Sequence, residues 1–200
     1  MTTTTAPVPL RLAVVTGSSR SGRYAPAVTR WFVDAVGDRA DLELDVLDVA
    51  DLELPADGPA LPPRSGQYDA PAAALAARLS AADAFVLVVP EYNHGYPAAL
   101  KHAIDATYWE WAAKPVGFVS YGGAFGGVRA VEQLRQVVVE LHGTTVRDQV
   151  AVPAVYAAFD QEGRARGEVP VIGDLDALLD QLLWWGRALR AARAEVPYAA

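Results

Sequence analysis

Short apolar runs alternate along the chain with longer stretches in which apolar residues recur at helical spacing. A short apolar run is typical of a β-strand, and the helical spacing is typical of a helix with one buried face. The predicted strands are 10–16, 42–47, 84–89, 115–120 and 144–152. Residues 84–89 are apolar throughout, as in a strand covered on both faces, and the last strand is broken at Arg147 and Asp148.

Helices are predicted between and after these strands. They cover 25–36, 72–82, 98–111, 131–141 and a final stretch that Asp174 caps. Pro97 suits the first turn of the third helix, and Gly143 is the expected C-cap of the fourth. The final helix has an apolar stripe, which consists of Leu175, Leu178, Leu182, Trp185 and Leu189, and its apolar face is unusually wide because Leu183 and Trp184 fall beside the stripe.

This alternation predicts an α/β fold with a doubly wound parallel sheet and helices on both faces. Two strand orders compete, the six-stranded dinucleotide-binding order and the five-stranded flavodoxin-like order 2-1-3-4-5. Five strands and a single glycine-rich turn after the first strand favour the flavodoxin-like order. We expect one such domain over residues 10–195, after a disordered lead at 1–9 and with one long Pro- and Gly-rich loop at 54–71.

In that order the first, third and fourth strands are neighbours, so the loops at their carboxyl ends meet where such folds bind ligands. These loops are 17–23, 90–96 and 120–123. The second of them, P-E-Y-N-H-G-Y, is rich in side chains that bond a planar ligand. We interpret the three loops as one binding site for a flavin.

The first loop, G-S-S-R-S-G-R, enters a helix, where free backbone amides and the helix dipole favour a phosphate. It matches neither the dinucleotide motif nor the nucleoside triphosphate motif, so a monophosphate fits it better. Arg20 and Arg23 supply charge for a dianion in an otherwise acidic protein. A plain Gly/Ser turn with solvated arginines explains the same residues equally well.

The second loop is the candidate for the flavin ring, because its backbone amides suit the N5 edge and the pyrimidine oxygens. Gly95 permits a close approach of the chain. The side chains that would face the ring are Tyr92, Asn93 or His94. The third loop, 120–123, would close the other edge of the ring.

A simpler interpretation of the second and third loops stays open. In it, Glu91 caps a local turn, Tyr96 packs on a helix and His94 is solvated. The third loop is then an ordinary connection between a strand and a helix.

Composition narrows the class of protein. The 200 residues carry a net charge of −7, which argues against nucleic acid or an anionic membrane as a partner. The absence of cysteine excludes disulfides and thiol nucleophiles, the three histidines lack metal spacing, and no hydrolase motif is present. No run reaches the roughly 18 apolar residues of a membrane span and no signal pattern is present, so we expect a cytoplasmic protein.

Three stretches together resemble the NADPH-dependent FMN reductases, a flavodoxin-like family that includes azo dye, quinone and chromate reductases. They are G-S-S-R-S-G-R, P-E-Y-N-H-G-Y-P-A-A-L-K-H-A-I-D-A and K-P-V-G-F-V-S-Y-G-G-A-F-G-G-V-R-A-V-E-Q-L-R. The resemblance spans residues 12–152, and its P-E-Y-N block is highly specific. His102 departs from the pattern, because the family usually has asparagine there, and this affects the packing of the local helix.

The resemblance implies FMN as the cofactor and assigns residues to it. The implied ligands are Ser18, Arg20 and Arg23 for the phosphate, Pro90, Glu91, Tyr92, Asn93 and His94 for the ring, and Ser120, Tyr121, Gly122 and Gly123 for its far edge. For Glu91 and His94, a contact with a partner subunit is the alternative to a flavin contact. No metal site is expected.

The function implied by the resemblance is hydride transfer from NADPH or NADH to flavin N5, and then electron transfer to a second acceptor. Free flavin, a quinone, an azo compound and a metal oxyanion all suit an open ring face. The alternatives are an electron carrier that never meets a nicotinamide and a flavin-free interaction protein on the same fold. The family also implies a homodimer or homotetramer, for which the last helix and the Trp109/Trp111 pair offer apolar surface.

Overall fold

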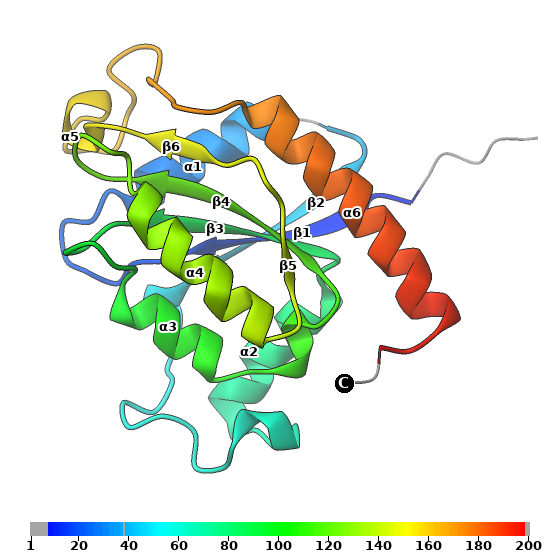
Figure 1. The fold of residues 1–200 in the computed structure, drawn as a ribbon. Helices are drawn as coiled ribbons and strands as arrows, with labels where there is room; N and C mark the ends of the chain where they lie inside the picture. The colour runs from blue at the N-terminus through cyan, green and yellow to red at the C-terminus, as the bar shows by residue number, and fades with distance from the viewer. Residues whose placement is uncertain (1–7, 38, 199–200) are drawn as a thin grey trace, which may run out of the picture.

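A computed structural model, which describes residues 8–37 and 39–198, has a parallel sheet between two layers of helices (Figure 1). The strands are β1 Leu10–Thr16, β2 Leu42–Asp48, β3 Ala84–Pro90, β4 Pro115–Tyr121, β5 Thr144–Thr145 and β6 Val150–Val152. Their order is β2-β1-β3-β4-β5, and β6 also pairs with β4. This confirms the flavodoxin-like order. The predicted lead at 1–9 lies, except for its last two residues, outside the described residues.

The break predicted in the last strand is confirmed. β5 and β6 both pair with β4, but the ladder is interrupted between them, after the Val146 amide has donated to the Val116 carbonyl (3.1 Å). There the Arg135 guanidinium donates to the carbonyls of Val146 (2.7 Å) and Arg147 (3.1 Å). This side chain supplies hydrogen bonds that the interrupted strand lacks.

The helices are α1 Ala25–Val36, α2 Ala70–Ala81, α3 Ala98–Asp105, α4 Val128–Glu140, α5 Val155–Ala158 and α6 Leu175–Glu195. The prediction of one helix over 98–111 is wrong, because α3 ends at Asp105 and a separate 3₁₀ turn, η3, covers Trp109–Trp111. At that turn the Glu110 carboxylate accepts from the Tyr108 amide (3.0 Å), a local bond that competes with helix formation. None of the described helices is long and apolar enough to cross a membrane.

The C-terminus of α4 differs from its prediction in one position. The left-handed residue is His142 (φ 59°), not Gly143. The amides of His142 and Gly143 donate to the carbonyls of Val139 and Val138, 3.0 Å in each case, which is a Schellman arrangement. Glycine is required at position 143 for a steric reason and not for a left-handed conformation, since a Cβ there would lie 2.8 Å from Val138 Cγ1.

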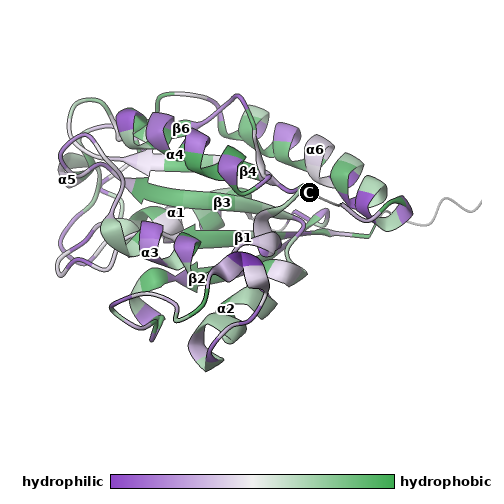
Figure 2. Cartoon of the chain, turned by 60° about the horizontal axis from the view of Figure 1, so that its bottom comes forward, coloured by the Kyte–Doolittle hydropathy of each residue, from purple (hydrophilic) through white to green (hydrophobic). Residues whose placement is uncertain are grey.

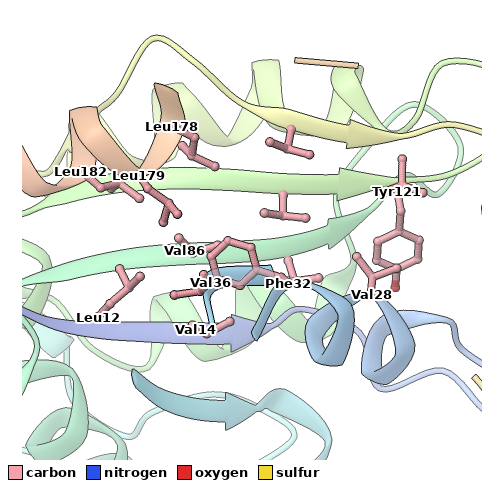
Figure 3. Packing of buried hydrophobic residues seen from close by; sticks show 14 of the residues in the cluster. Leu12, Val14, Val28, Phe32, Val36, Val86, Tyr121, Leu178, Leu179 and Leu182 are labelled. Atoms are coloured by element: carbon pink, nitrogen blue, oxygen red, sulfur yellow. The ribbon is translucent and has the colours of Figure 1, made fainter. Parts of the chain in front are cut away.

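Each face of the sheet has its own hydrophobic core. One core lies under α1 and α6, where Phe32 and Leu182 belong to one buried cluster with residues of β1, β3 and β4 (Figure 3). The other lies under α2, α3 and α4. Figure 2 shows the apolar β3 between these layers, and β3 is buried at every position, as predicted. With both faces covered, the ends of the strands are the places left for a ligand.

The Trp109/Trp111 pair does not form the apolar surface predicted for it. Trp111 is 3% exposed and packs in the core, with its ring centre 4.5 Å from that of Phe85. Trp109 is half-buried, and its indole N–H donates to the Arg64 carbonyl (2.9 Å). Trp111 is therefore a core residue, and Trp109 anchors the loop between β2 and α2.

The buried face of α6 also differs from the predicted stripe. Its buried residues are Leu178, Leu179, Leu182, Leu183 and Gly186. Trp185, assigned to the stripe, is 40% exposed. Two glycines select this face, because a Cβ at Gly117 would lie 2.8 Å from Leu178 and one at Gly186 would lie 2.8 Å from Leu10.

Lys114, which precedes β4, is buried with its ammonium group hydrogen-bonded to the last turn of α2. It is 6% exposed and donates to the carbonyls of Leu79 (2.7 Å) and Ser80 (3.1 Å). Desolvation, assisted by Arg193 and opposed by nearby carboxylates, lowers the pKa of Lys114 from 10.5 to about 8. Between these values the unfolded chain binds more protons, so the contribution of Lys114 to the free energy of unfolding rises with pH.

We therefore expect wild type to gain stability relative to Lys114→Met as the pH rises. Between pH 8 and pH 10.5 the free energy of unfolding of wild type should increase by about 2 to 3 kcal/mol more than that of the variant. Below this window the lysine is protonated in both states of the wild type, so the difference between the two proteins stays constant. Urea unfolding at several pH values measures it, with Lys101→Met, at a lysine of α3 whose side chain is only partly buried, as the matched control. A difference that stays flat across the window would contradict the prediction.

Candidate functional site

The fold brings the three predicted loops together at the carboxyl edge of the sheet (Figure 1). They follow β1, β3 and β4, which are neighbours in the sheet. Two contacts join the loops directly. The Ser18 hydroxyl lies 2.8 Å from the Tyr92 hydroxyl, and the Glu91 amide donates to the Tyr121 carbonyl (3.3 Å).

The turn after β1 is tight and keeps backbone amides free. A Cβ at Gly17 would lie 2.8 Å from the Val88 carbonyl oxygen, so only glycine permits this approach. Ser18 is fully buried, and its hydroxyl accepts from the Arg20 amide (3.4 Å) as well as contacting Tyr92. The amides of Ser19, Ser21 and Gly22 have no partner in the described part of the chain. Ahead of α1, they form a donor set suited to an anion.

The two arginines of this turn are placed differently. Arg23 donates to both oxygens of the Asp48 carboxylate (2.8 Å each) and to the Ser18 carbonyl, so its charge is compensated. Arg20 is exposed, with its guanidinium 5.5 Å from the centre of the Tyr92 ring. Among the ion pairs of the described residues, Arg20 takes part in none. Arg20 is thus available to a phosphate, whereas Arg23 braces the turn against the end of β2.

The loop after β3 is a tight turn with two left-handed residues at its centre. Tyr92 and Gly95 exchange two backbone hydrogen bonds (2.9 and 3.0 Å), and between them Asn93 has φ 51° and His94 has φ 72°. The special conformation therefore falls on these two residues and not on Gly95. Within residues 8–37 and 39–198, the amides of Asn93 and His94 have no hydrogen-bond partner. The turn keeps two donors available for a ligand.

Residues of α4 hold this loop, and the sequence analysis did not single them out. Arg129 pairs with the buried Glu91 carboxylate and donates to His94 Nε2 (2.8 Å), and Gln133 donates to the His94 carbonyl (2.9 Å). Glu91 also accepts from the Arg129 amide (3.2 Å), so it caps the first turn of the distant helix α4, whereas the simpler interpretation expected it to cap a local turn. Both α4 residues lie in the V-R-A-V-E-Q-L-R stretch, but the pattern alone does not show that they contact residues 38 and 39 positions earlier.

The loop after β4 begins with two buried hydroxyl groups. Ser120 and Tyr121 are 0% and 3% exposed, and neither hydroxyl has a hydrogen-bond partner among the residues that the structure describes. Burial raises the pKa of Tyr121 well above its ordinary value, so its hydroxyl keeps the proton and remains a donor. The amides beyond it that lack a partner in the described chain are those of Gly123, Ala124 and Phe125.

These groups fit a flavin mononucleotide. A phosphate needs amide donors and a cation, which the turn after β1 supplies with its amides and Arg20. A ring with acceptor atoms on one edge needs donors without partners, and the loops after β3 and β4 supply them. Among the implied ligands, Pro90 and Ser120 are buried within the strand ends, so their side chains do not line an open surface.

Comparison with known proteins identifies relatives of the chain. The family model described as NADPH-dependent FMN reductase matches residues 10–157. An NAD(P)H-dependent FMN reductase of Schizosaccharomyces pombe is 36% identical over 130 residues, and the match covers 64% of each chain, less than two thirds of that relative. A quinone reductase of Escherichia coli K12 is 31% identical over 201 residues, which cover 92% of this chain and 97% of that protein.

A solved structure has the same fold. The flavoenzyme NAD(P)H:acceptor oxidoreductase FerB from Paracoccus denitrificans aligns with a TM-score of 0.60 at 22% sequence identity. The alignment covers 90% of this chain and 98% of FerB. At this level of identity the likeness shows a shared architecture.

Proposed function

The chain belongs to the NADPH-dependent FMN reductase family, and we propose that it is an FMN-dependent oxidoreductase that takes hydride from NAD(P)H and passes electrons to a small-molecule acceptor. One observation carries the proposal: three loops on adjacent strands present unpaired amides beside one uncompensated arginine, Arg20. FMN supplies the hydride chemistry when it is bound. The acceptor classes are free flavin, a quinone, an azo compound and a metal oxyanion.

The residues of the chain bind and orient the cofactor in this proposal. The Arg20 side chain and the amides of Ser19, Ser21 and Gly22 hold the phosphate. The amides of Asn93, His94 and Gly123 donate to the edges of the ring. The Tyr121 hydroxyl, buried and protonated, is one further donor within the cluster. Preorganised donors of this kind stabilise negative charge without reorganising at the moment of reaction.

An anaerobic titration tests the proposal. The protein is loaded with FMN, desalted and mixed with NADPH or NADH, and the visible flavin absorbance is expected to disappear and to return when a quinone is added. Absorbance that persists with both nucleotides would instead favour an electron carrier. Loss of FMN on desalting would favour a flavin-free protein on the same fold.

Replacing Arg20 with alanine is expected to weaken FMN binding by about tenfold to a hundredfold, because a charge-assisted hydrogen bond to the phosphate is lost. The free energy of unfolding of the apoprotein should stay within about 0.5 kcal/mol of wild type, since Arg20 is exposed and unpaired. Calorimetric titration with FMN measures the affinity. Arg30→Ala, at an exposed arginine on α1, is the control, and equal losses in the two variants would contradict a specific phosphate contact.

We further propose a single domain over residues 10–195 that acts in the cytoplasm as a homodimer or homotetramer. The apolar surface in support lies on α6, where Trp184 and Trp185 are 64% and 40% exposed and their ring centres lie 4.9 Å apart. Light scattering over a range of protein concentrations measures the oligomeric state. A monomer at every concentration would contradict the proposal.

A further inference from the structure

Arg129, in the first turn of α4, contacts both loops that would flank the flavin ring. Its guanidinium pairs with the Glu91 carboxylate and donates to His94 Nε2 (2.8 Å), and both of these residues lie in the loop after β3. The same guanidinium lies 4.8 Å from the ring centre of Phe125, in the loop after β4. One side chain therefore joins the two ring loops.

The ion pair between Glu91 and Arg129 is unequally buried. The Glu91 side chain is 8% exposed, whereas that of Arg129 is 40% exposed. The carboxylate also accepts from the Arg129 amide (3.2 Å), so both of its bonds come from one residue. A buried carboxylate without a partner is strongly unfavourable, and the loss of Arg129 would leave Glu91 in that state.

The contacts of α4 also impose a backbone conformation on the ring loop. Asn93 and His94 are both left-handed, a conformation that costs free energy for non-glycine residues and that surrounding contacts stabilise. Arg129 holds the imidazole of His94, and Gln133 holds its carbonyl (2.9 Å). These contacts keep the turn in the form that leaves the amides of Asn93 and His94 without a partner.

We propose that Arg129 is a positioning residue that fixes the ring loop for FMN, and that Glu91 cancels its charge beside the ring. The inference rests on the proposed function, because it requires FMN at this loop. A cation beside a group that gains negative charge on reduction raises the reduction potential, and an anion lowers it. The potential of bound FMN then depends on the balance of this pair.

Three neutralising variants test the charge. In Glu91→Gln the uncompensated Arg129 is expected to raise the two-electron reduction potential of bound FMN, and in Arg129→Gln the uncompensated Glu91 is expected to lower it. The double variant should return close to the wild-type potential. Spectroelectrochemical titration measures all four proteins. A loop brace without an electrostatic role would not shift the single variants in opposite directions, so shifts of the same sign, or no shift, would overturn the proposal.

A conservative variant separates charge from geometry and remains informative if Arg129→Gln binds no FMN. Arg129→Lys keeps the charge but loses the planar fork that holds Glu91 and His94 together. It is expected to keep the wild-type potential while binding FMN about tenfold more weakly. A potential shift as large as that of Arg129→Gln, or unchanged affinity, would overturn the proposal.

The matched controls neutralise an exposed ion pair at the opposite edge of the sheet. Arg11 and Glu43 pair at 3.2 Å with side chains 54% and 60% exposed, so Arg11→Gln and Glu43→Gln should leave both potential and affinity unchanged. Equal shifts in these controls would overturn the assignment to Arg129. Failure of the wild-type protein to bind FMN would count against the proposed function, whereas FMN bound with unshifted potentials would count against this inference alone.

Discussion

Replacement of Gly127 with alanine is expected to destabilise the protein by about 4 kcal/mol and to abolish FMN binding. Gly127 precedes α4 with φ 86°, a conformation that strains any other residue. A Cβ there would lie 2.7 Å from the carbonyl oxygen and 3.0 Å from the amide nitrogen of Tyr121. These are backbone atoms of β4, which cannot rotate away, so the strand end or the loop at 122–127 must move.

A second glycine of the same loop provides the control for this prediction. Gly123 has no positive φ, and a Cβ added there would meet nothing within 4 Å. Gly123→Ala should therefore change the free energy of unfolding by no more than about 0.5 kcal/mol. Urea unfolding measures stability, and quenching of flavin fluorescence measures FMN binding. Equal free energies of unfolding for the two variants would contradict the prediction, because the close approach to Tyr121 at Gly127 would then not affect stability.

Replacement of Asp83 with alanine is expected to lower the free energy of unfolding by about 3 kcal/mol. Asp83, just before β3, has a side chain that is 13% exposed. Its carboxylate accepts from the Arg11 amide (3.1 Å) and from the guanidinium groups of Arg190 (3.1 Å) and Arg193 (3.5 Å). Without it, two partly buried cations at the end of α6 lose their counter-charge, and this helix loses an attachment to the sheet.

The exposed ion pair of Asp45 and Arg78 is the matched control for Asp83. The Asp45 side chain is 49% exposed and lies 2.6 Å from Arg78, so its replacement with alanine should change the free energy of unfolding by less than about 1 kcal/mol. Chemical unfolding of the two variants beside wild type measures the comparison. A loss at Asp45 as large as that at Asp83 would contradict the role assigned to burial.

Two predictions about helices were wrong, and in each case particular contacts explain the difference. The third helix stops at Asp105 although its apolar spacing continues, because Glu110 captures the Tyr108 amide (3.0 Å). The final helix buries Leu179, which was not assigned to the stripe, and leaves Trp185 40% exposed, because Gly117 of β4 and Gly186 of the helix itself allow close contact on the buried side. Periodicity describes an isolated helix, whereas the buried face depends on the surface it meets.

In the candidate site, too, some features were predicted from the sequence and others were not. The loops after β1, β3 and β4 were predicted as neighbours because glycines and polar residues stand at the ends of apolar strands, and strand order then places them together. The different contacts of Arg20 and Arg23 were not predictable from the sequence. Both stand in one short turn, and only the position of Asp48 at the end of β2 distinguishes them.

The sequence by itself determined the strands, their flavodoxin-like order, the three loops and the family, because each depends on local periodicity or on a contiguous motif. Tertiary structure alone decided which side chains contact those loops and hold them in place. Arg129 and Gln133 contact residues 38 and 39 positions earlier, in the turn where Asn93 and His94 are left-handed. Such contacts join segments that are distant in the chain, so they exist only after the sheet has brought β3 and α4 side by side.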